Sequence, residues 1–336
     1  MKLQQIRYLL GVVDNNFNIT TAAENLYTSQ PGISKQIRLL EDELGVQLFV
    51  RRGKRIESLT QAGERAVVHG RRIMQEVENI RNLARELKGE SRGSLRLGTT
   101  HTQARHVLPP VIQGFRKLHP EVIFDIHQGT SEQIAGMLSS GDVDFVMVTS
   151  SRERFPDLVQ LPVYQWDRVL LVPRDHPLAR YPKAPELEQL ARHPLVTYVF
   201  SDRPESSLMQ AFNAQNLRPN IAFTARDADV IKTYVRMGLG VGVLASMAVE
   251  EGSDDDLVAL DARHLLPRLT TWVGFRRDSL LRQFQLDFLS RLAPHLTPER
   301  VEAAREAENQ AEVDALFAEV RIPLHDNPPR PQLAGC

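Results

Sequence analysis

The stretch from residue 18 to residue 52 most constrains what this chain can fold into, because it predicts two short helices, a tight turn and a basic corner. Ser29 can cap the second helix, and Pro31 fits its first turn, where a missing N–H costs little. One face of the first helix carries small and apolar side chains that let another helix cross it closely: Thr21, Ala22, Ala23 and Leu26. These features predict a helix-turn-helix.

The second of these helices has two different faces. Ile33, Ile37 and Leu40 recur at helical spacing and predict its buried face. The opposite face is a candidate DNA-reading surface and carries Ser34, Lys35 and Arg38. Alanine-rich helix pairs with a polar turn are also common in ordinary helical domains, so this pattern alone leaves both interpretations open.

A basic cluster follows the helix pair and favours DNA binding. After the apolar pair Leu48 and Phe49, four cations gather around Gly53, as a wing that grips phosphates would require: Arg51, Arg52, Lys54 and Arg55. A solvated charge run is the alternative. The chain as a whole has a net charge of only -1, so any attraction to DNA must be local. Residues 1–88 carry 14 Lys/Arg against 10 Asp/Glu, whereas residues 297–336 carry 4 against 8.

This segment resembles the N-terminal DNA-binding domain of the LysR-type transcriptional regulators. The family pattern is matched at Ala22, Ala23, Leu26, Ser29 to Pro31, Ser34 to Ile37, Leu40, Glu41, Leu44, Gly45, Leu48, Phe49 and Arg51. Gly32 departs from it, because many members have alanine there, and should loosen the first turn slightly. The resemblance implies DNA contacts from Ser29, Gln30, Pro31, Ser34, Lys35 and Arg38 at the groove and from Arg51 and Arg52 on phosphates.

After the basic corner, Thr60 can cap a long helix that runs to about Lys88. Its apolar residues alternate in steps of four and three, which is a heptad seam: Ala66, Gly70, Ile73, Val77, Ile80, Ala84 and Leu87. The seam could instead lie on the domain's own core, but the stripe is narrow and charged residues flank it. We expect a dimerisation helix, as the family resemblance also implies. The sequence GESRG at 89–93 then predicts a hinge.

From Ser94 the pattern changes to short apolar strands that alternate with helices, which is typical of parallel βαβ units. The resemblance implies two α/β lobes of the periplasmic-binding-protein type with a cleft between them. We therefore expect an α+β multidomain protein with a winged helix-turn-helix at 1–59, a linker helix and hinge at 60–89, and an effector domain at 90–296 (lobe I about 90–163 and 268–296, lobe II about 164–267). We also expect one acidic helix at 298–320, within a C-terminal part of 297–336 that ends in a disordered tail.

A candidate ligand site follows the first strand of the effector domain. Residues 99–103 read Thr-Thr-His-Thr-Gln, a dense set of hydrogen-bonding side chains at a helix start, where free amides favour small anions. Plain N-capping by one threonine is the alternative. Thr149 stands at a second strand end of the same kind.

Several stretches resemble the branch of the LysR-type family that activates cysteine biosynthesis genes, above all residues 224–249. This implies an acetylserine-type inducer or a sulfate-like anion, bound by Thr100, Thr102, Gln103, Thr149 and Trp166. The loop at 201–206 departs from these relatives. There Arg203 can add positive charge, so we include it in the site, while Asp202 can repel an anion by about 1 kcal/mol or more.

Other chemistries find little support. The GLGVG at 238–242 follows a helix and enters a strand, the reverse of a dinucleotide fingerprint, and predicts a helix stop with a tight turn. Asp227 and Asp229 are expected to cap a helix, with contact to an inducer's amino group as the minor alternative. The histidines show no metal spacing and there is no nucleophile elbow, so we expect neither an enzyme nor a metal or other cofactor.

The single cysteine, Cys336, excludes an intrachain disulfide and fits a reducing cytoplasm. No apolar run approaches the ~20 residues that span a bilayer. We expect a cytoplasmic activator, a homodimer or homotetramer on inverted repeats of double-stranded DNA, in contact with RNA polymerase. A LysR-type regulator of another metabolite, such as an organosulfonate or an aromatic acid, is the alternative; a solute-binding protein or an enzyme with a regulatory domain fits less well.

Overall fold

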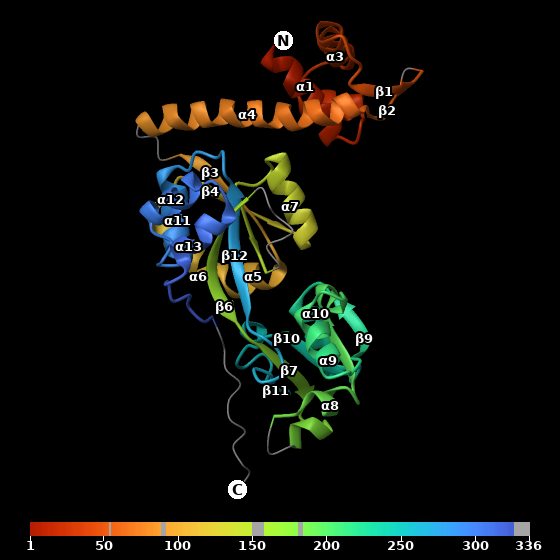
Figure 1. Ribbon diagram of the computed structural model, residues 1–336, viewed down its shortest axis with the longest axis vertical. Coiled ribbons are helices and arrows are strands. Elements are labelled where there is room, and N and C mark those ends of the chain that lie inside the picture. The colour runs from red at the N-terminus through yellow and green to blue at the C-terminus, as the bar shows by residue number, and fades with distance from the viewer. Residues whose placement is uncertain (54, 89–91, 150–157, 181–183, 326–336) are drawn as a thin grey trace. The chain divides into compact units, whose positions relative to one another are not determined.

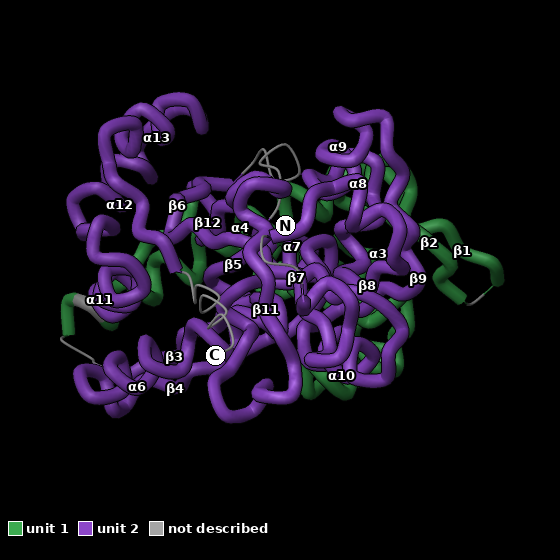
Figure 2. The backbone as a smooth tube through the Cα atoms, turned by 90° about the horizontal axis from the view of Figure 1, so that it is seen from below, with its two compact units in different colours: residues 1–90, 139–142, 278–282 green, residues 91–138, 143–277, 283–336 purple. Residues whose placement is uncertain are grey.

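The computed structural model describes residues 1–53, 55–88, 92–149, 158–180 and 184–325. It divides into two compact units, one formed by residues 1–90 with 139–142 and 278–282 and the other by the remainder (Figure 2), and each is described by itself. None of the helices in these ranges is long and apolar enough to cross a membrane. The expected tail disorder at 326–336, most of the expected hinge and Lys54 lie outside the described residues.

The first unit contains the predicted helix-turn-helix and wing. Its elements are α1 (Leu3–Asp14), α2 (Ile19–Asn25), α3 (Gln30–Leu44), β1 (Phe49–Arg52), β2 (Arg55–Leu59) and α4 (Gln61–Leu87). The Ser29 hydroxyl accepts a hydrogen bond from the backbone N–H of Gly32, as predicted, and α3 ends at Gly45 in the left-handed conformation. β1 and β2 pair antiparallel as the wing.

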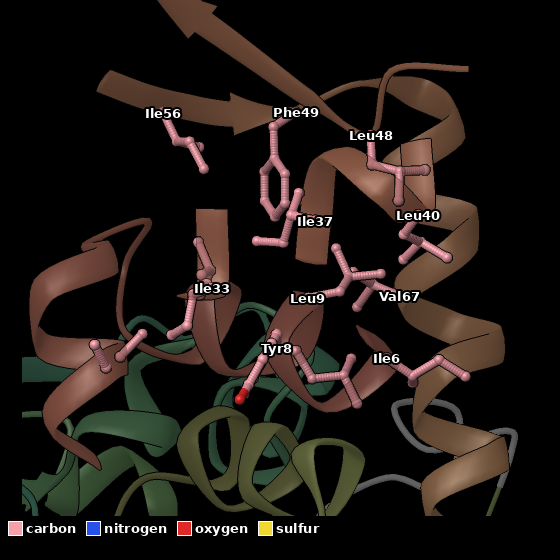
Figure 3. Packing of buried hydrophobic residues seen from close by; sticks show 14 residues of the cluster. Ile6, Tyr8, Leu9, Ile33, Ile37, Leu40, Leu48, Phe49, Ile56 and Val67 are labelled. Atoms are coloured by element: carbon pink, nitrogen blue, oxygen red, sulfur yellow. The ribbon is translucent and has the colours of Figure 1, made fainter. Parts of the chain in front are cut away.

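The core of this unit confirms the predicted buried face of α3. Ile33, Ile37 and Leu40 are buried against Leu9 of α1 and Phe49 of β1 (Figure 3). Gly63, in the first turn of α4, is required because a Cβ there would lie 2.0 Å from the backbone oxygen of Leu48. The start of α4 is therefore packed directly onto the base of the wing.

The two halves of α4 have different environments. Thr60 caps the helix, with its hydroxyl accepting from the N–H of Gly63, and Val67 and Gly70 are buried in the first half. In the second half Ile80, Leu83 and Leu87 are exposed large apolar side chains. Such a stripe fits the predicted dimerisation role, which stays a prediction.

The second unit has two five-stranded sheets. The first is built from β3 (Gly93–Thr99), β4 (Val122–Gln128), β5 (Phe145–Val148), β6 (Leu158–Trp166) and β12 (Leu269–Arg276), in the order β4-β3-β5-β12-β6. β3 is parallel to β4 and β5, whereas β12 is antiparallel to β5 and β6. Its helices are α5 (His101–His106), α6 (Leu108–Leu118), α7 (Ser131–Ser140) and α11 (Gln283–Leu292). The segment between β3 and β4 forms two helices, because α5 ends at His106 and a second helix with Pro109 and Pro110 in its first turn begins at Leu108.

The other sheet contains β7 (Arg168–Pro173), β8 (Pro194–Tyr198), β9 (Asn220–Ala225), β10 (Val241–Ala245) and β11 (Leu257–Asp261), in the order β11-β7-β10-β8-β9. β8 is parallel to β9 and β10, but β7 is antiparallel to β10 and β11. Its helices are α8 (Leu187–Leu190), α9 (Ser207–Ala214) and α10 (Ala228–Arg236). The expected two-lobed α/β architecture is confirmed, whereas the expectation of parallel strands holds for only part of each sheet.

Two segments connect the sheets. β6 ends at Trp166 and β7 begins at Arg168, so the first connection is the buried Asp167. The second connection precedes β12 and contains Arg268, whose Nε and Nη2 donate to the two carboxylate oxygens of Asp167 at 3.0 and 2.9 Å. This bidentate pair ties the two connections together.

The expectation of one acidic helix over 298–320 is wrong. The segment forms α12 (Pro298–Glu306) and α13 (Gln310–Phe317), because Ala307 leaves the helical conformation and Asn309 caps the second helix. α12 and α13 pack beside each other and against β6 (Figure 1), where Val301, Val313 and Phe317 are buried. This extension is therefore part of the packed second unit.

Candidate ligand cavity and nucleic-acid interface

A cavity of about 480 Å³ lies in the second unit, where strands of both sheets end. It is bordered by all six residues that sequence analysis assigned to ligand binding: Thr100, Thr102, Gln103, Thr149, Trp166 and Arg203. Thr100 follows β3, Thr149 follows β5, and Arg203 follows the short helix Val199–Asp202 after β8. This is the strand-end position at which α/β folds bind ligands. Cavities of this volume accommodate small organic molecules.

Several hydrogen-bonding side chains form one connected group, which we call the threonine end of the cavity. The hydroxyls of Thr149 and Thr271 lie 2.9 Å apart. Trp166 Nε1 donates to both at 3.3 and 3.1 Å, and Gln103 Nε2 lies 3.3 and 3.4 Å from them. Gln103 Oε1 in turn accepts from the Thr99 hydroxyl at 2.8 Å. The group is thus held in place by its own hydrogen bonds.

Thr100 has a different arrangement. It occupies the N-cap position of α5, but its side chain makes no capping hydrogen bond. The alternative that this threonine simply caps the helix is therefore wrong. Thr100 borders the cavity, so its hydroxyl is a candidate ligand contact.

The loop at 201–206, where the sequence departs from the relatives, carries Arg203, which forms an ion pair with Glu132 of α7. Arg203 Nη1 donates to Glu132 Oε1 at 2.7 Å, and both residues border the cavity. This hydrogen bond lowers the pKa of Glu132 to about 2 and raises the pKa of Arg203. Asp202 is exposed and does not border the cavity. The positive charge of Arg203 is therefore balanced by a carboxylate from α7, and the expected repulsion from Asp202 does not arise at the cavity wall.

Three buried polar side chains of this cavity were not predicted from the sequence. Arg168, Tyr164 and Ser201 border it, and among the residues that the structure describes Arg168 Nε, the Tyr164 hydroxyl and the Ser201 hydroxyl have no hydrogen-bond partner. The one signal in the sequence was an arginine at the start of the apolar run RVLLVP, which a buried strand would rarely carry without a role.

Asp227 and Asp229 lie beside the cavity's helices. Asp227 caps α10 by accepting from the N–H of Val230 at 2.9 Å, as predicted. The Asp229 carboxylate instead accepts from Arg105 Nη1 at 2.5 Å and lies 3.1 Å from His101 Nε2. His101, Asp227 and Asp229 have ligand atoms close enough together to hold a metal ion, but one oxygen of each carboxylate already makes the contacts just described.

The predicted DNA-reading residues lie on one exposed surface of α3. Ser29, Gln30, Pro31, Lys35 and Arg38 are exposed and Ser34 is half-buried. Arg52 in β1 has an 87% exposed side chain and lies 4.0 Å from Glu57. Arg51 differs, because its guanidinium donates to the buried Glu41 at 2.6 and 3.1 Å and to Gln47 at 2.8 Å. Arg52 is thus the freer of the two predicted phosphate contacts.

Two family models match this chain and identify the class of protein to which it belongs. Residues 3–64 match the model of the "bacterial regulatory helix-turn-helix protein, lysR family", and residues 88–297 match that of the "LysR substrate binding domain". The chain belongs to the LysR family of transcriptional regulators.

Individual relatives resemble the chain over nearly its whole length. It is 47% identical to the transcriptional regulator CysB of Haemophilus influenzae, over 96% of this chain and 99% of that protein. It is 41% identical to SsuR of Burkholderia cenocepacia, over 95% and 99% of the two chains. The crystal structure of the cofactor-binding domain of the Cbl regulator matches 64% of this chain and 95% of that chain, with a TM-score of 0.60 and 39% identity.

Proposed function

We propose that this protein regulates sulfur assimilation and cysteine biosynthesis genes in response to an acetylserine-type inducer or a sulfate-like anion bound in the cavity. The similarity to CysB and Cbl supports this ligand class. The observation that carries the proposal is the threonine end, where hydroxyl and amide groups from several strand ends meet beside Thr100 and Thr102. Neutral donors of this kind suit a small anion.

The identity to SsuR favours a second candidate function, a regulator of the same family that responds to another metabolite such as an organosulfonate. Thermal-shift measurements on the full chain with acetylserine, sulfate, thiosulfate and sulfonates separate the two, because a ligand raises stability with its concentration. Stabilisation by a sulfonate alone would favour the second candidate. Stabilisation by acetylserine or an inorganic sulfur anion would favour the first.

The proposed assembly is based on membership of the LysR family and on the exposed apolar stripe of α4. We propose a homodimer or homotetramer paired through the stripe on α4, with α3 in the major groove of inverted half-sites and the wing on the backbone. The domain boundaries of the sequence analysis, the contact with RNA polymerase and the cytoplasmic location belong to the same proposal.

The proposed mechanism is a ligand-biased closure of the two lobes. Arg105 and His101 of α5 contact Asp229 of the second sheet's half, and Glu132 contacts Arg203. These contacts join the halves on either side of the cavity, while Asp167 and Arg268 join the connections. A ligand that binds the closed arrangement more tightly shifts the population toward it.

Replacing Thr100 by alanine is expected to lower the affinity for the inducer about tenfold and to leave operator binding intact, because the hydroxyl borders the cavity and stabilises nothing in the helix. Calorimetry on the full chain measures the first quantity and fluorescence anisotropy the second. Ser94→Ala, at the exposed start of β3, is the control. Full inducer affinity in Thr100→Ala would remove Thr100 from the site.

Replacing Arg52 by alanine is expected to weaken binding to all DNA sequences to a similar extent and to reduce the salt slope of the binding constant by about one, since one phosphate contact is lost. Anisotropy titrations over a range of salt concentrations measure this slope. Arg81→Ala changes an arginine on α4 that pairs with Glu78 and should leave the slope unchanged. An unchanged slope in Arg52→Ala would argue against a phosphate contact.

A further inference from the structure

Arg168 lies in an environment that is unusual for a buried cation. It is the first residue of β7 and only 4% exposed. Its Nη2 donates to the Ser207 hydroxyl at 2.6 Å and to the backbone oxygen of Pro267 at 3.3 Å, whereas its Nε has no partner among the described residues. Buried arginines are normally paired with carboxylates. The adjacent Asp167 favours the charge of Arg168, but its two carboxylate oxygens accept hydrogen bonds from Arg268.

Within the described residues Arg168 therefore forms no ion pair of its own at the wall of the cavity, and the nearby Asp167 only partly offsets the cost of its burial. Burial lowers the pKa of its guanidinium to about 10, so the group stays protonated at neutral pH. An unpaired buried charge costs free energy, which an anion in the cavity would offset. Arg168 borders the cavity, so its guanidinium is part of the wall that such an anion would face.

Ser201 is another buried polar residue that borders the cavity. It is 1% exposed, and its hydroxyl has no partner within the part of the chain that is described. The loop that follows ties it to Arg168, because Ser206 donates to the backbone oxygen of Ser201 at 2.6 Å and Ser207 contacts Arg168. We call Arg168, Ser201 and Ser207 the arginine end of the cavity.

The cavity is thus bordered by two groups of polar side chains, the threonine end and the arginine end, and also by apolar side chains. Phe200, Met247 and Trp272 are among these apolar side chains. A volume of about 480 Å³ is in the range that holds small organic molecules and is large for a single inorganic tetraoxoanion. An occupant that satisfies both ends must carry two polar groups on an organic frame.

We propose that Arg168 binds the carboxylate of an organic acid whose second polar group reaches the threonine end, so that this residue makes the cavity select organic acids over inorganic sulfate. The inference rests on the proposed function, because it takes the cavity to be the inducer site. A guanidinium N–H to a carboxylate oxygen is among the stronger hydrogen bonds in proteins.

The test is calorimetry on the full chain with three probes: N-acetylserine, its methyl ester, which lacks the charged carboxylate, and sodium sulfate. The wild-type protein is expected to bind the acid at least about tenfold more tightly than the ester. Arg168→Gln is expected to lose about tenfold or more of the affinity for the acid and to bind sulfate as the wild type does. Arg168→Lys keeps the charge without the planar donor group and should recover only part of the loss.

The outcomes separate the two proposals. Equal binding of acid and ester, or full affinity for the acid in Arg168→Gln, would overturn the role of Arg168. Wild-type protein that binds sulfate but not the acid would also overturn the role of Arg168, but it would leave the proposal of a sulfate-like ligand intact. A wild-type protein that binds none of the probes would overturn both. If Arg168→Gln does not fold, the role of Arg168 is decided by the comparison of acid with ester and by the affinity of Ser201→Ala for the acid. The exposed Arg192→Gln is the control.

Discussion

Replacing Glu41 by alanine is expected to destabilise the DNA-binding unit by about 3 kcal/mol or more. The Glu41 side chain is buried at the end of α3 and accepts from the backbone N–H groups of Leu48 and Phe49 at 2.8 and 3.2 Å as well as from Arg51. Its removal leaves two buried amides and one cation without this partner. Since these amides anchor the base of the wing, operator affinity should fall together with stability.

Hydrogen exchange on the full chain measures this effect where it should occur, at the amides of Leu48 and Phe49. Glu41→Gln keeps a side-chain oxygen for the amides and loses the charge for Arg51, so an intermediate effect is expected. Asp42→Ala changes an exposed carboxylate on the same helix and is the matched control. Unchanged protection of the two amides in Glu41→Ala would show that Glu41 does not hold the wing.

Replacing Asp254 by alanine is expected to destabilise the second unit by roughly 3 kcal/mol, because it leaves the buried Lys232 with only the more distant carboxylate of Asp229, at 3.5 Å. The side chains of Asp254 and Lys232 are 2% and 4% exposed and lie 3.0 Å apart. Asp254 also accepts from the N–H of Glu250 at 2.9 Å and from Arg236 at 2.8 Å. Both tryptophans, Trp166 and Trp272, are in this unit, so urea unfolding followed by tryptophan fluorescence measures the loss.

The control for this variant is Asp256→Ala, which removes an exposed carboxylate that also pairs with Arg236 and should cost below about 1 kcal/mol.

The contribution of Asp254 to the stability of the second unit should also depend on pH. Burial opposes its charged form, but the N–H of Glu250 and the ammonium of Lys232 outweigh burial and hold its pKa below the usual 3.8. The stabilisation is therefore present above pH 3.8 and disappears as the pH falls through the lower folded-state value. Equal stability of Asp254→Ala and Asp256→Ala would contradict this account.

The sequence was most informative where local rules decide the structure. The buried face of α3, the cap at Ser29 and the helix stop before Val241 follow from spacing, capping chemistry and glycine, with Gly238 at a φ of 78°. β6 and β11 were not predicted. β6 is buried along most of its length and contains Pro162, so it shows neither alternation nor a turn signal, and β11 is only five residues long.

Among the cavity residues, too, only those with a local sequence signal were predicted. Thr100, Thr102 and Gln103 are neighbours in sequence, so a strand end followed by a helix start was enough to single them out. The contact between Arg203 and Glu132 joins residues 71 positions apart, and that between Trp166 and Thr271 joins residues 105 apart. No local pattern predicts such pairs. Arg168 could not be recognised as unpaired until the structure showed that Asp167 binds Arg268.

The packing of the C-terminal extension has a practical consequence for work on the isolated effector domain. The LysR substrate binding domain model ends at residue 297, yet α13 covers the edge strand β6, and the backbone of Gln165 exchanges hydrogen bonds with Pro323 and His325 at 2.8 and 2.7 Å. A fragment cut at the family boundary would leave this edge uncovered and open to association with other chains, one residue away from Trp166 of the cavity. The segment that folds as a unit is longer than the segment by which relatives are recognised, and expression fragments should extend to residue 325.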